Sequence, residues 1–409
     1  MKLNTIAVHA GDRKRPSKDQ TPWIPATTPI YSATTFFYED AAELDQVLGM
    51  EKVGQSYSRY NNPSNDALEE LVNALEGGFG ALACSTGMSA LFMALSSGLV
   101  DRPGVILAAN LLYGATLSML SKVFELNGAR VVFADFTNEA EVAAAIAEHK
   151  PSVLLMETIA NPTLRVPPLD RISKMARAAK AVLIVDNTFA TPMMYRPLHP
   201  GTHGEGAHMV VHSLTKYLGG HGDTLGGVVI SDEEHYTPLR VLSRTIGCGL
   251  GPFEANQAMR GIKTFPLRFE RQCANASAVA KWLATHPAID RVIFPEDPRH
   301  PDAENISRMF TPGLYGGIVT FEVKGADKQG IFRVMNALRT VVPATSLGDV
   351  HSMVLYPAIA SHRDLSPKHR LRLGIPENML RLSVGIEAVE DITADLDQAL
   401  LRAADQNPG

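Results

Sequence analysis

One lysine stands in a setting that suits covalent chemistry. Lys216 lies in the stretch HMVVHSLTKYLGGH, residues 208–221, where an apolar run is followed by the hydroxyl residues Ser213 and Thr215. A lysine amine is nucleophilic only when its pKa falls, which an apolar site or a neighbouring cation achieves. Most lysines are solvated surface charges, so this stretch alone is weak evidence. It indicates that Lys216 could form a Schiff base beside hydroxyls that suit a phosphate.

A second stretch supplies an acidic partner. Residues 181–186, AVLIVD, form a short apolar run that ends in Asp186. Open α/β sheets place functional residues at the carboxyl ends of their strands. A Schiff-base lysine with an acidic residue for a pyridinium nitrogen is typical of pyridoxal 5'-phosphate (PLP) sites. Without Lys216, Asp186 would be interpreted as an N-cap in a strand-to-helix turn; the two stretches together predict PLP as the cofactor.

Ten separated blocks, in one order, then resemble a known family. The blocks are TTPIYSATTF, YSRYNNPS, STGMSA, LLYGAT, ETIANPT, VDNTFATP, HSLTKYLGGH, RGIKT, SLGD and RLSVGIE. They extend from about Thr27 to Asp395 and are similar to the PLP-dependent enzymes of cysteine and methionine metabolism. That family holds cystathionine γ-synthases, cystathionine lyases and methionine γ-lyases. The resemblance implies an α/β fold like that of aspartate aminotransferase, with a smaller C-terminal α+β domain.

The cofactor phosphate requires hydrogen-bond donors. The turn at 85–88 follows an apolar run and opens a helix, whose free N–H groups and positive dipole end favour an anion. A simple helix cap is the alternative interpretation. The resemblance implies main-chain contacts from the turn, hydroxyl contacts from the lysine stretch, and two side chains from a neighbouring chain. These residues are Gly87, Met88, Ser213, Thr215, Tyr57 and Arg59.

The ring and the substrate require further partners. Tyr113, in LLYGAT, can stack on the ring and offers a phenol for proton transfer, although a lone tyrosine is more often an ordinary loop residue. The resemblance places Asn161 near the ring hydroxyl and the substrate. It places Arg381 on the substrate carboxylate, with the Ser346 backbone nearby; an arginine between strand leucines is otherwise an edge-strand charge. The predicted catalytic residues are Lys216, Tyr113 and Asp186.

Several positions bear on the substrate. Ala115 stands where methionine-cleaving members of the family typically carry cysteine, and Thr345 where cystathionine-cleaving members often carry glutamate. His351 replaces a commonly acidic residue, and the connection 199–208 is longer than usual, whereas SLGD resembles the methionine γ-lyases. The resemblance implies γ-elimination from a γ-substituted L-amino acid, L-methionine first, to a 2-oxo acid, ammonia and the leaving group. Elimination from or replacement on cystathionine, O-acylhomoserine or canavanine remain alternatives, and a non-catalytic PLP-binding protein is a remote one.

The elements that must position these residues are predicted from periodicity. Residues 1–63 have many turn-formers and aromatics but little amphipathic pattern, which predicts an arm that packs on a neighbouring subunit. Residues 64–265 alternate apolar runs with helical segments, which predicts a mostly parallel sheet covered on both faces. Residues 266–409 predict a smaller α+β domain. The expected strands of the large domain are 80–84, 104–109, 129–134, 152–157, 181–186, 208–212 and 226–230, and its expected helices include 87–99, 114–127, 138–149 and 169–179.

Composition limits the remaining possibilities. The chain has 409 residues, 45% of them hydrophobic and 20% charged, with a formal net charge of −5. No basic surplus points to nucleic acid, and no apolar run approaches the ~18 residues of a membrane span. The three cysteines show neither metal-ligand nor disulfide spacing, so each is expected to be a small buried hydrophobe. We therefore expect a cytoplasmic enzyme without a metal. The resemblance implies a homo-oligomer, a tetramer built from dimers that share active sites.

Overall fold

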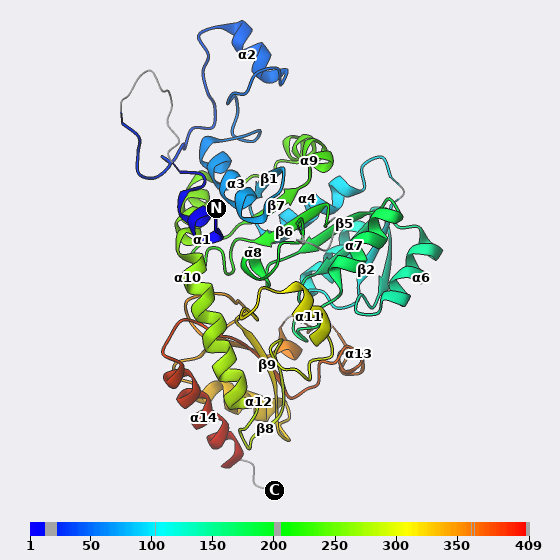
Figure 1. Ribbon diagram of the computed structural model, residues 1–409, viewed down its shortest axis with the longest axis vertical. Helices are drawn as coiled ribbons and strands as arrows, with labels where there is room; N and C mark the ends of the chain where they lie inside the picture. The colour runs from blue at the N-terminus through cyan, green and yellow to red at the C-terminus, as the bar shows by residue number, and fades with distance from the viewer. Residues whose placement is uncertain (13–22, 103, 200–205, 361, 364, 406–409) are drawn as a thin grey trace.

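The computed structural model describes residues 1–12, 23–102, 104–199, 206–360, 362–363 and 365–405. Two sheets, one of seven strands and one of five, lie one above the other in Figure 1. The helix α10 (Pro252–Leu283) runs alongside both. The predicted fold class, a mostly parallel sheet flanked by helices with a smaller C-terminal sheet, is confirmed.

The large sheet is built from short apolar runs. Its order is β1-β7-β6-β5-β4-β2-β3, and only β7 runs antiparallel to its neighbours. The central strands are buried on both faces, which is why they show continuous Val, Ile and Leu rather than alternation, whereas the edge strand β3 is largely accessible. The strands are β1 (Gly80–Cys84), β2 (Val105–Ala109), β3 (Arg130–Ala134), β4 (Val153–Glu157), β5 (Val182–Asp186), β6 (Met209–Ser213) and β7 (Gly227–Ser231).

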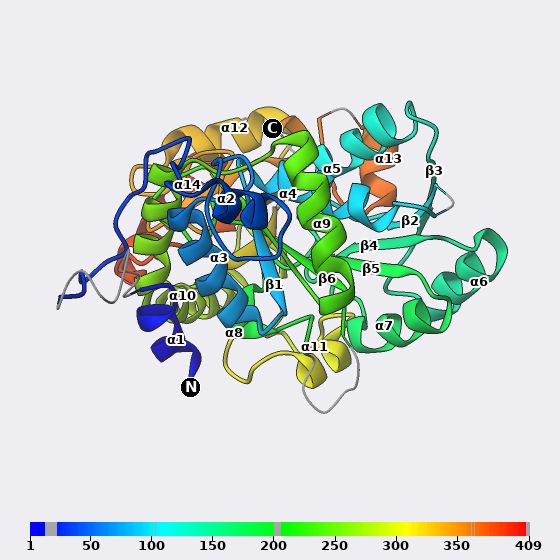
Figure 2. The ribbon, with the colours of Figure 1, turned by 90° about the horizontal axis from the view of Figure 1, so that it is seen from above.

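Helices cover both faces of this sheet. Figure 2 shows β4 and β5 between α5 on one side and α6 and α7 on the other. The segment predicted as one helix, 114–127, is an α-helix that continues as a π-helical turn over Leu120–Phe124. The helices are α3 (Pro63–Glu76), α4 (Gly87–Gly98), α5 (Gly114–Met119), α6 (Glu139–His149), α7 (Leu169–Ala178), α8 (Thr191–Met194) and α9 (Glu233–Ile246).

The amino-terminal region differs in part from the predicted arm. The helix α1 (Leu3–His9) packs on the body of its own chain, with Ala7 fully buried. Its apolar positions 3, 6, 7 and 10 have helical spacing. This short pattern was not used when residues 1–63 were predicted to form one arm. The segment carrying α2 (Ala41–Leu48) projects from the molecule in Figure 1, and Phe37 is 95% and Val53 99% exposed. Contact of this segment with a neighbouring subunit stays a prediction.

The five-stranded sheet has a core of its own. Its order is β10-β11-β12-β9-β8, and α12 and α14 cover it. The boundary predicted between residues 265 and 266 falls inside α10, where Phe265 belongs to the first core and Ala276 to the second. The domain division therefore stays a prediction. The elements are β8 (Ile289–Ile293), β9 (Ile318–Val323), β10 (Val342–Pro343), β11 (Met353–Leu355), β12 (Met379–Ser383), α11 (Ala303–Met309), α12 (Lys328–Ala337), α13 (Pro367–Arg372) and α14 (Val389–Asp405).

Candidate active site

A cavity of about 240 Å³ lies at the carboxyl ends of the parallel strands, under residues from the small sheet. This edge of the sheet is where open α/β folds bind their ligands. The cavity collects most of the predicted site residues although they come from distant parts of the chain. Those that line it are Gly87, Met88, Tyr113, Asn161, Asp186, Ser213, Thr215, Lys216, Thr345 and Arg381.

Lys216 follows β6 and reaches into this cavity. Its Nζ donates to the Ser346 hydroxyl at 3.0 Å. Burial, and then the nearby Arg381 guanidinium, lower the pKa of Lys216 to about 8. Both effects disfavour the charged ammonium form. A sizeable fraction of this amine is therefore neutral near pH 7–8, as a nucleophile or proton acceptor requires.

Two carboxyl groups lie side by side below it. Glu157 ends β4 and Asp186 ends β5, and the two are directly paired across the parallel strands. Burial, and then the charge of Asp186, raise the pKa of Glu157 to about 8. Burial also raises the pKa of Asp186, against the hydrogen bonds from Thr188. In the free protein one proton therefore stays on this pair near neutral pH, because two adjacent buried carboxylates repel each other.

Glu157 was missed among the predicted residues, although it closes an apolar run as Asp186 does. Its Oε1 accepts the Tyr113 N–H at 2.6 Å and its Oε2 accepts the Asn161 N–H at 3.3 Å. One buried carboxyl thus holds the two loops that carry the predicted ring-stacking and ring-hydroxyl residues. The signal was present in the sequence: a carboxylate at the end of a buried strand, four residues before Asn161.

Arg381 enters the cavity from β12 of the other sheet. It is 2% exposed, its Nη1 donates to Asn161 Oδ1 at 2.9 Å, and its Nη2 donates to the Ser346 carbonyl at 3.1 Å. Its Nε has no hydrogen-bond partner among the described residues. Burial lowers the pKa of Arg381 to about 10. A buried guanidinium with a free donor is suited to bind a carboxylate, so the interpretation as an edge-strand charge is not needed.

The turn before α4 forms a cradle at the other end of the cavity. Thr86 caps the helix through a capping box with Ser89, which leaves the next N–H groups directed outward. Gly87 packs against Ser213 so closely that a Cβ on the glycine would lie 2.9 Å from the serine Cβ. The Ser213 and Thr215 side chains line the same cavity. The helix N–H groups and the two hydroxyls form a donor set of the kind that binds phosphate, and the glycine lets the backbone come close to such a ligand.

Four predicted residues do not line the cavity within one chain. The Arg59 guanidinium donates to the Arg244 carbonyl of its own chain, and Tyr57 is 44% exposed. Ser346 instead contacts the cavity residues Lys216 and Arg381. Ala115 lies in the first turn of α5 but not at the cavity. The role of the first two across a subunit interface stays a prediction.

Two other features of the sequence, His351 and the long connection 199–208, are not part of this cavity as the structure describes it. His351 is paired with Asp349 at 3.2 Å, and its side chain is 68% exposed. Most of the long connection 199–208 falls in residues 200–205, which are outside the described residues.

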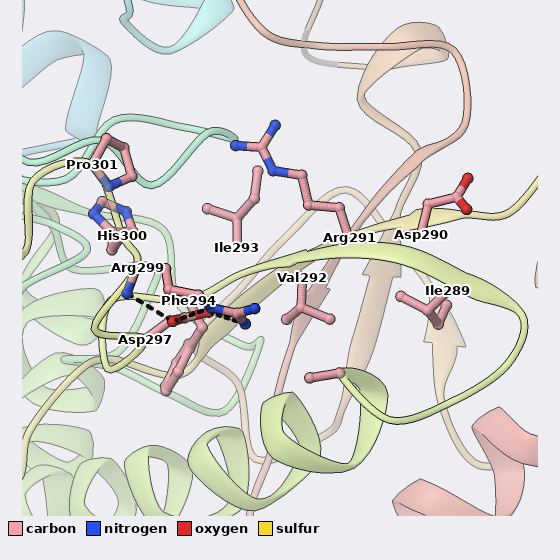
Figure 3. Close-up of a pocket in the computed structure, with 11 residues that line it drawn as sticks. Ile289, Asp290, Arg291, Val292, Ile293, Phe294, Asp297, Arg299, His300 and Pro301 are labelled. Carbon is pink, nitrogen blue, oxygen red and sulfur yellow. Dashed lines mark hydrogen bonds and ion pairs between the residues drawn. The ribbon is translucent and has the colours of Figure 1, made fainter.

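A larger cavity, about 280 Å³, lies along the edge strand β8 (Figure 3). Arg299 and Asp297 are paired with each other there at 2.8 Å. The described residues that line it include no lysine and no counterpart of the carboxyl pair. Volume alone therefore does not select the candidate site; the smaller cavity is the one that collects the predicted residues.

Comparison with known proteins shows the family of this chain. The family described as "Cys/Met metabolism PLP-dependent enzyme" matches residues 4–401, and the chain belongs to it. An L-methionine γ-lyase of Fusobacterium nucleatum subsp. polymorphum is 37% identical over 401 residues, 97% of this chain and 98% of that protein. An O-succinylhomoserine sulfhydrylase of Pseudomonas aeruginosa is 34% identical, over 97% of this chain and 95% of that protein.

Solved structures add the fold and the cofactor. A cystathionine γ-synthase of Xanthomonas oryzae pv. oryzae, in complex with aminoacrylate and cysteine, superposes with a TM-score of 0.90 at 31% identity, covering all of both chains. A Campylobacter jejuni structure, described as a putative O-acetylhomoserine (thiol)-lyase, contains a pyridoxyl-lysine phosphate. It is 25% identical and covers 98% of this chain and all of that one, with a TM-score of 0.89.

The family establishes several of the predictions. The protein is a PLP-dependent enzyme of cysteine and methionine metabolism, consistent with a carbon–sulfur lyase, and its substrate is an amino acid. The donor set of the cavity fits that cofactor, since each part of PLP has a partner of the right chemistry. None of the helices in the described residues has the length and apolar character needed to cross a membrane.

Proposed function

We propose that the protein catalyses γ-elimination from an L-amino acid with an uncharged γ-substituent, L-methionine being the first candidate. The observation that carries this proposal is the charge inventory of the cavity. Its charged lining residues are Glu157, Asp186, Lys216 and Arg381. The last three have tasks at the cofactor or the substrate carboxylate, and Glu157 is engaged by the backbone N–H groups of Tyr113 and Asn161. The other described lining residues are neutral, among them Ile159, Phe189, Leu225 and Leu347.

The neutral lining bears on which γ-substituent can enter. Cystathionine carries a second charged amino-acid group, and O-succinylhomoserine carries a second carboxylate. Burying either charge without a partner is costly. A thioether methyl group only requires apolar contact, which the cavity offers. The F. nucleatum relative named for L-methionine supports the same choice.

The chain's residues divide the reaction between them. When bound, PLP supplies an electron sink that makes the substrate's α- and β-protons acidic. Arg381 binds the substrate carboxylate, and its contacts with Asn161 and Ser346 fix its orientation. Lys216 Nζ removes the α-proton, for which its lowered pKa suits it. Asp186 stabilises positive charge on the ring nitrogen.

The remaining step concerns the leaving group. Tyr113 is the N-cap of α5 and lines the cavity, which supports its phenol as the acid that donates a proton as the γ-bond breaks. The Tyr113 backbone is fixed by Glu157, so the position of the acid depends on that carboxyl. The 2-oxo acid and ammonia then follow from hydrolysis of the unsaturated product. A homotetramer with shared sites, located in the cytoplasm, forms part of this proposal.

Two substrates that differ in charge at the γ-substituent test the proposal. We expect turnover of L-methionine to methanethiol and a 2-oxo acid, with a higher kcat/KM than for cystathionine. O-acetylhomoserine and O-succinylhomoserine have similar leaving groups but differ by one carboxylate, so the acetyl ester should be the better substrate. A preference for the succinyl ester or for cystathionine would contradict the neutral-substituent argument.

One alternative is favoured by a specific observation. Sulfhydrylases that act on O-acylhomoserine are among the similar proteins, including an O-acetyl-L-homoserine sulfhydrylase of Leptospira meyeri at 31% identity. The γ-substituent of O-acetylhomoserine is also neutral. The same neutral lining therefore suits both γ-elimination from L-methionine and γ-replacement on O-acetylhomoserine. Added thiol separates them: γ-replacement forms a thioether and little 2-oxo acid, whereas γ-elimination forms the 2-oxo acid whether or not thiol is present.

A further inference from the structure

Two cysteines that are far apart in the sequence meet beside the cofactor's phosphate turn. Cys84 ends β1, and Cys248 follows α9. Their sulfur atoms lie 3.7 Å apart. Cys84 is fully buried, whereas Cys248 is partly accessible. The expectation that each cysteine is only a small buried hydrophobe therefore holds for Cys273 but does not describe this pair.

The surroundings make the two thiols unequal. The contact with the Cys84 sulfur, helped by the contact with the Ser243 hydroxyl and the charge of Arg240, outweighs burial and lowers the pKa of Cys248 to about 7. The same contact, together with burial, raises the pKa of Cys84. A partly accessible thiolate beside a second thiol is the arrangement found in peroxide-reactive cysteines with a resolving partner. Burial raises the pKa of Cys273 to about 12, which leaves that thiol unreactive.

The pair is joined to the phosphate turn through the backbone. Ser85, the first residue of the turn, donates its N–H to the Cys248 carbonyl at 2.9 Å. Cys84 and Gly249 form an isolated β-bridge. On its other side the segment touches Arg59, because a Cβ on Gly247 would lie 3.0 Å from the Arg59 Cδ. A movement of residues 247–249 therefore reaches the turn and a residue predicted to bind phosphate.

We propose that Cys84 and Cys248 are a site of oxidative modification by peroxide, and that the resulting disulfide loosens the phosphate site. The Cys248 thiolate attacks the peroxide, so that sulfur is oxidised to a sulfenic acid and the peroxide is reduced with loss of one water. The Cys84 thiol then attacks that sulfur, the S–S bond forms, and a second water leaves. Two thiols thus give up two electrons to one peroxide, and a thiol reductant reverses the change.

The geometry predicts which part moves. A disulfide bond is about 2.05 Å long, so the sulfur atoms must approach by roughly 1.7 Å from their present 3.7 Å. β1 is buried at every position, whereas residues 247, 249 and 251 are glycines. The glycine segment is therefore the one that shifts. A displacement of about 1 Å near a site can cost on the order of a hundredfold in rate.

The first measurement is chemical and does not depend on the proposed function. The holoenzyme is treated with hydrogen peroxide, remaining thiols are alkylated, and the digest is mapped by mass spectrometry. We expect a peptide linked through Cys84 and Cys248, with Cys273 alkylated. Absence of the linked peptide while other residues oxidise would overturn the proposal. Cys273→Ser is the matched control and should behave as the wild type does.

The second measurement follows PLP and activity. The link between the disulfide and PLP binding rests on the proposed phosphate site. PLP retention is therefore measured by absorbance after dialysis, in an assay separate from turnover. The oxidised wild type should lose PLP more readily and lose activity about tenfold or more, with recovery in dithiothreitol. Cys248→Ser, and Cys84→Ser or Cys84→Ala, should resist both losses. Equal losses in these variants would refute the role of the pair, and a disulfide without either loss would refute its coupling to the phosphate site.

Discussion

Replacing Glu157 with glutamine should change how the stability of the apoenzyme depends on pH. The carboxyl is 7% exposed and is paired with Asp186. These two causes raise its pKa from the ordinary 4.5 to about 8. Because the folded-state pKa lies above the unfolded value, the folded state binds the extra proton. The stability that Glu157 contributes is therefore fully present below pH 4.5 and is lost as the pH rises to 8.

The size of this effect follows from the rise in the pKa of Glu157. Between pH 4.5 and pH 8 the loss amounts to at most roughly 5 kcal/mol in the free energy of unfolding. Glutamine is close in shape to the protonated carboxyl but keeps only one of the two oxygens that accept the Tyr113 and Asn161 N–H groups, so at pH 4.5 the variant should be less stable by about 1–3 kcal/mol. Glutamine does not ionise, so from pH 4.5 to 8.5 the stability of Glu157→Gln should fall less than that of the wild type.

Chemical denaturation of the two apoenzymes at a series of pH values measures this difference. A difference that stays constant from pH 4.5 to 8.5 would mean that Glu157 ionises as an ordinary surface carboxyl does, and the reasoning about the pair would be wrong. Asp186→Asn provides the matched variant. It removes the neighbouring charge, so the loss of stability towards pH 8.5 should become smaller but should not disappear, since burial remains.

Three further results are expected. Reduction of the holoenzyme with borohydride should place a pyridoxyl group on Lys216 in peptide mapping, and a label on another lysine would exclude that assignment. Tyr113→Phe should retain PLP, because the ring survives, but lose elimination by roughly 10²–10⁴-fold; α-proton exchange should survive better, and equal loss of both would remove Tyr113 from the leaving-group step. Mixing Arg59→Ala chains with Lys216→Ala chains should restore activity in hybrid oligomers; no recovery despite subunit exchange would mean that each site is built from one chain.

The strands of the large sheet could be predicted because burial on both faces forces continuous apolar runs. Asp186 and Lys216 could be predicted as a pair because each closes or follows such a run. Their order across the sheet could not be predicted, since no local signal places β7 antiparallel between β1 and β6. The split of segment 114–127 into α- and π-helical turns also depends on packing rather than on residue type.

The missed parts of the site depend on contacts between distant residues. Glu157 was visible in ETIANPT, but only the pairing of β4 with β5 puts its carboxyl beside Asp186. The sulfur contact joins residues 164 positions apart, and no spacing rule connects them. Arg268 lies in a helical pattern that gives no hint of its four carbonyl partners. Sequence patterns report the local environment, whereas these features arise when separate elements meet.

The long helix α10 carries Arg268, and this has a consequence for how the enzyme can diversify. Arg268 donates to the carbonyls of Tyr217 and Leu218, directly after Lys216. Two turns further along the helix, Asn275 donates to the Gly385 carbonyl, beyond the strand that carries Arg381.

A single 32-residue helix therefore contacts both the segment that follows Lys216 and the segment beyond Arg381, although these two residues lie at different sheets. Neutral residues such as Leu225 and Thr345 line the cavity from loops and are not part of that framework. If Lys216 and Arg381 act as proposed, substitutions at those loop positions would change which γ-substituent fits while the helix keeps the segments of the lysine and the arginine in place. Substrate preference would then change within the family without a change in the residues that carry the reaction.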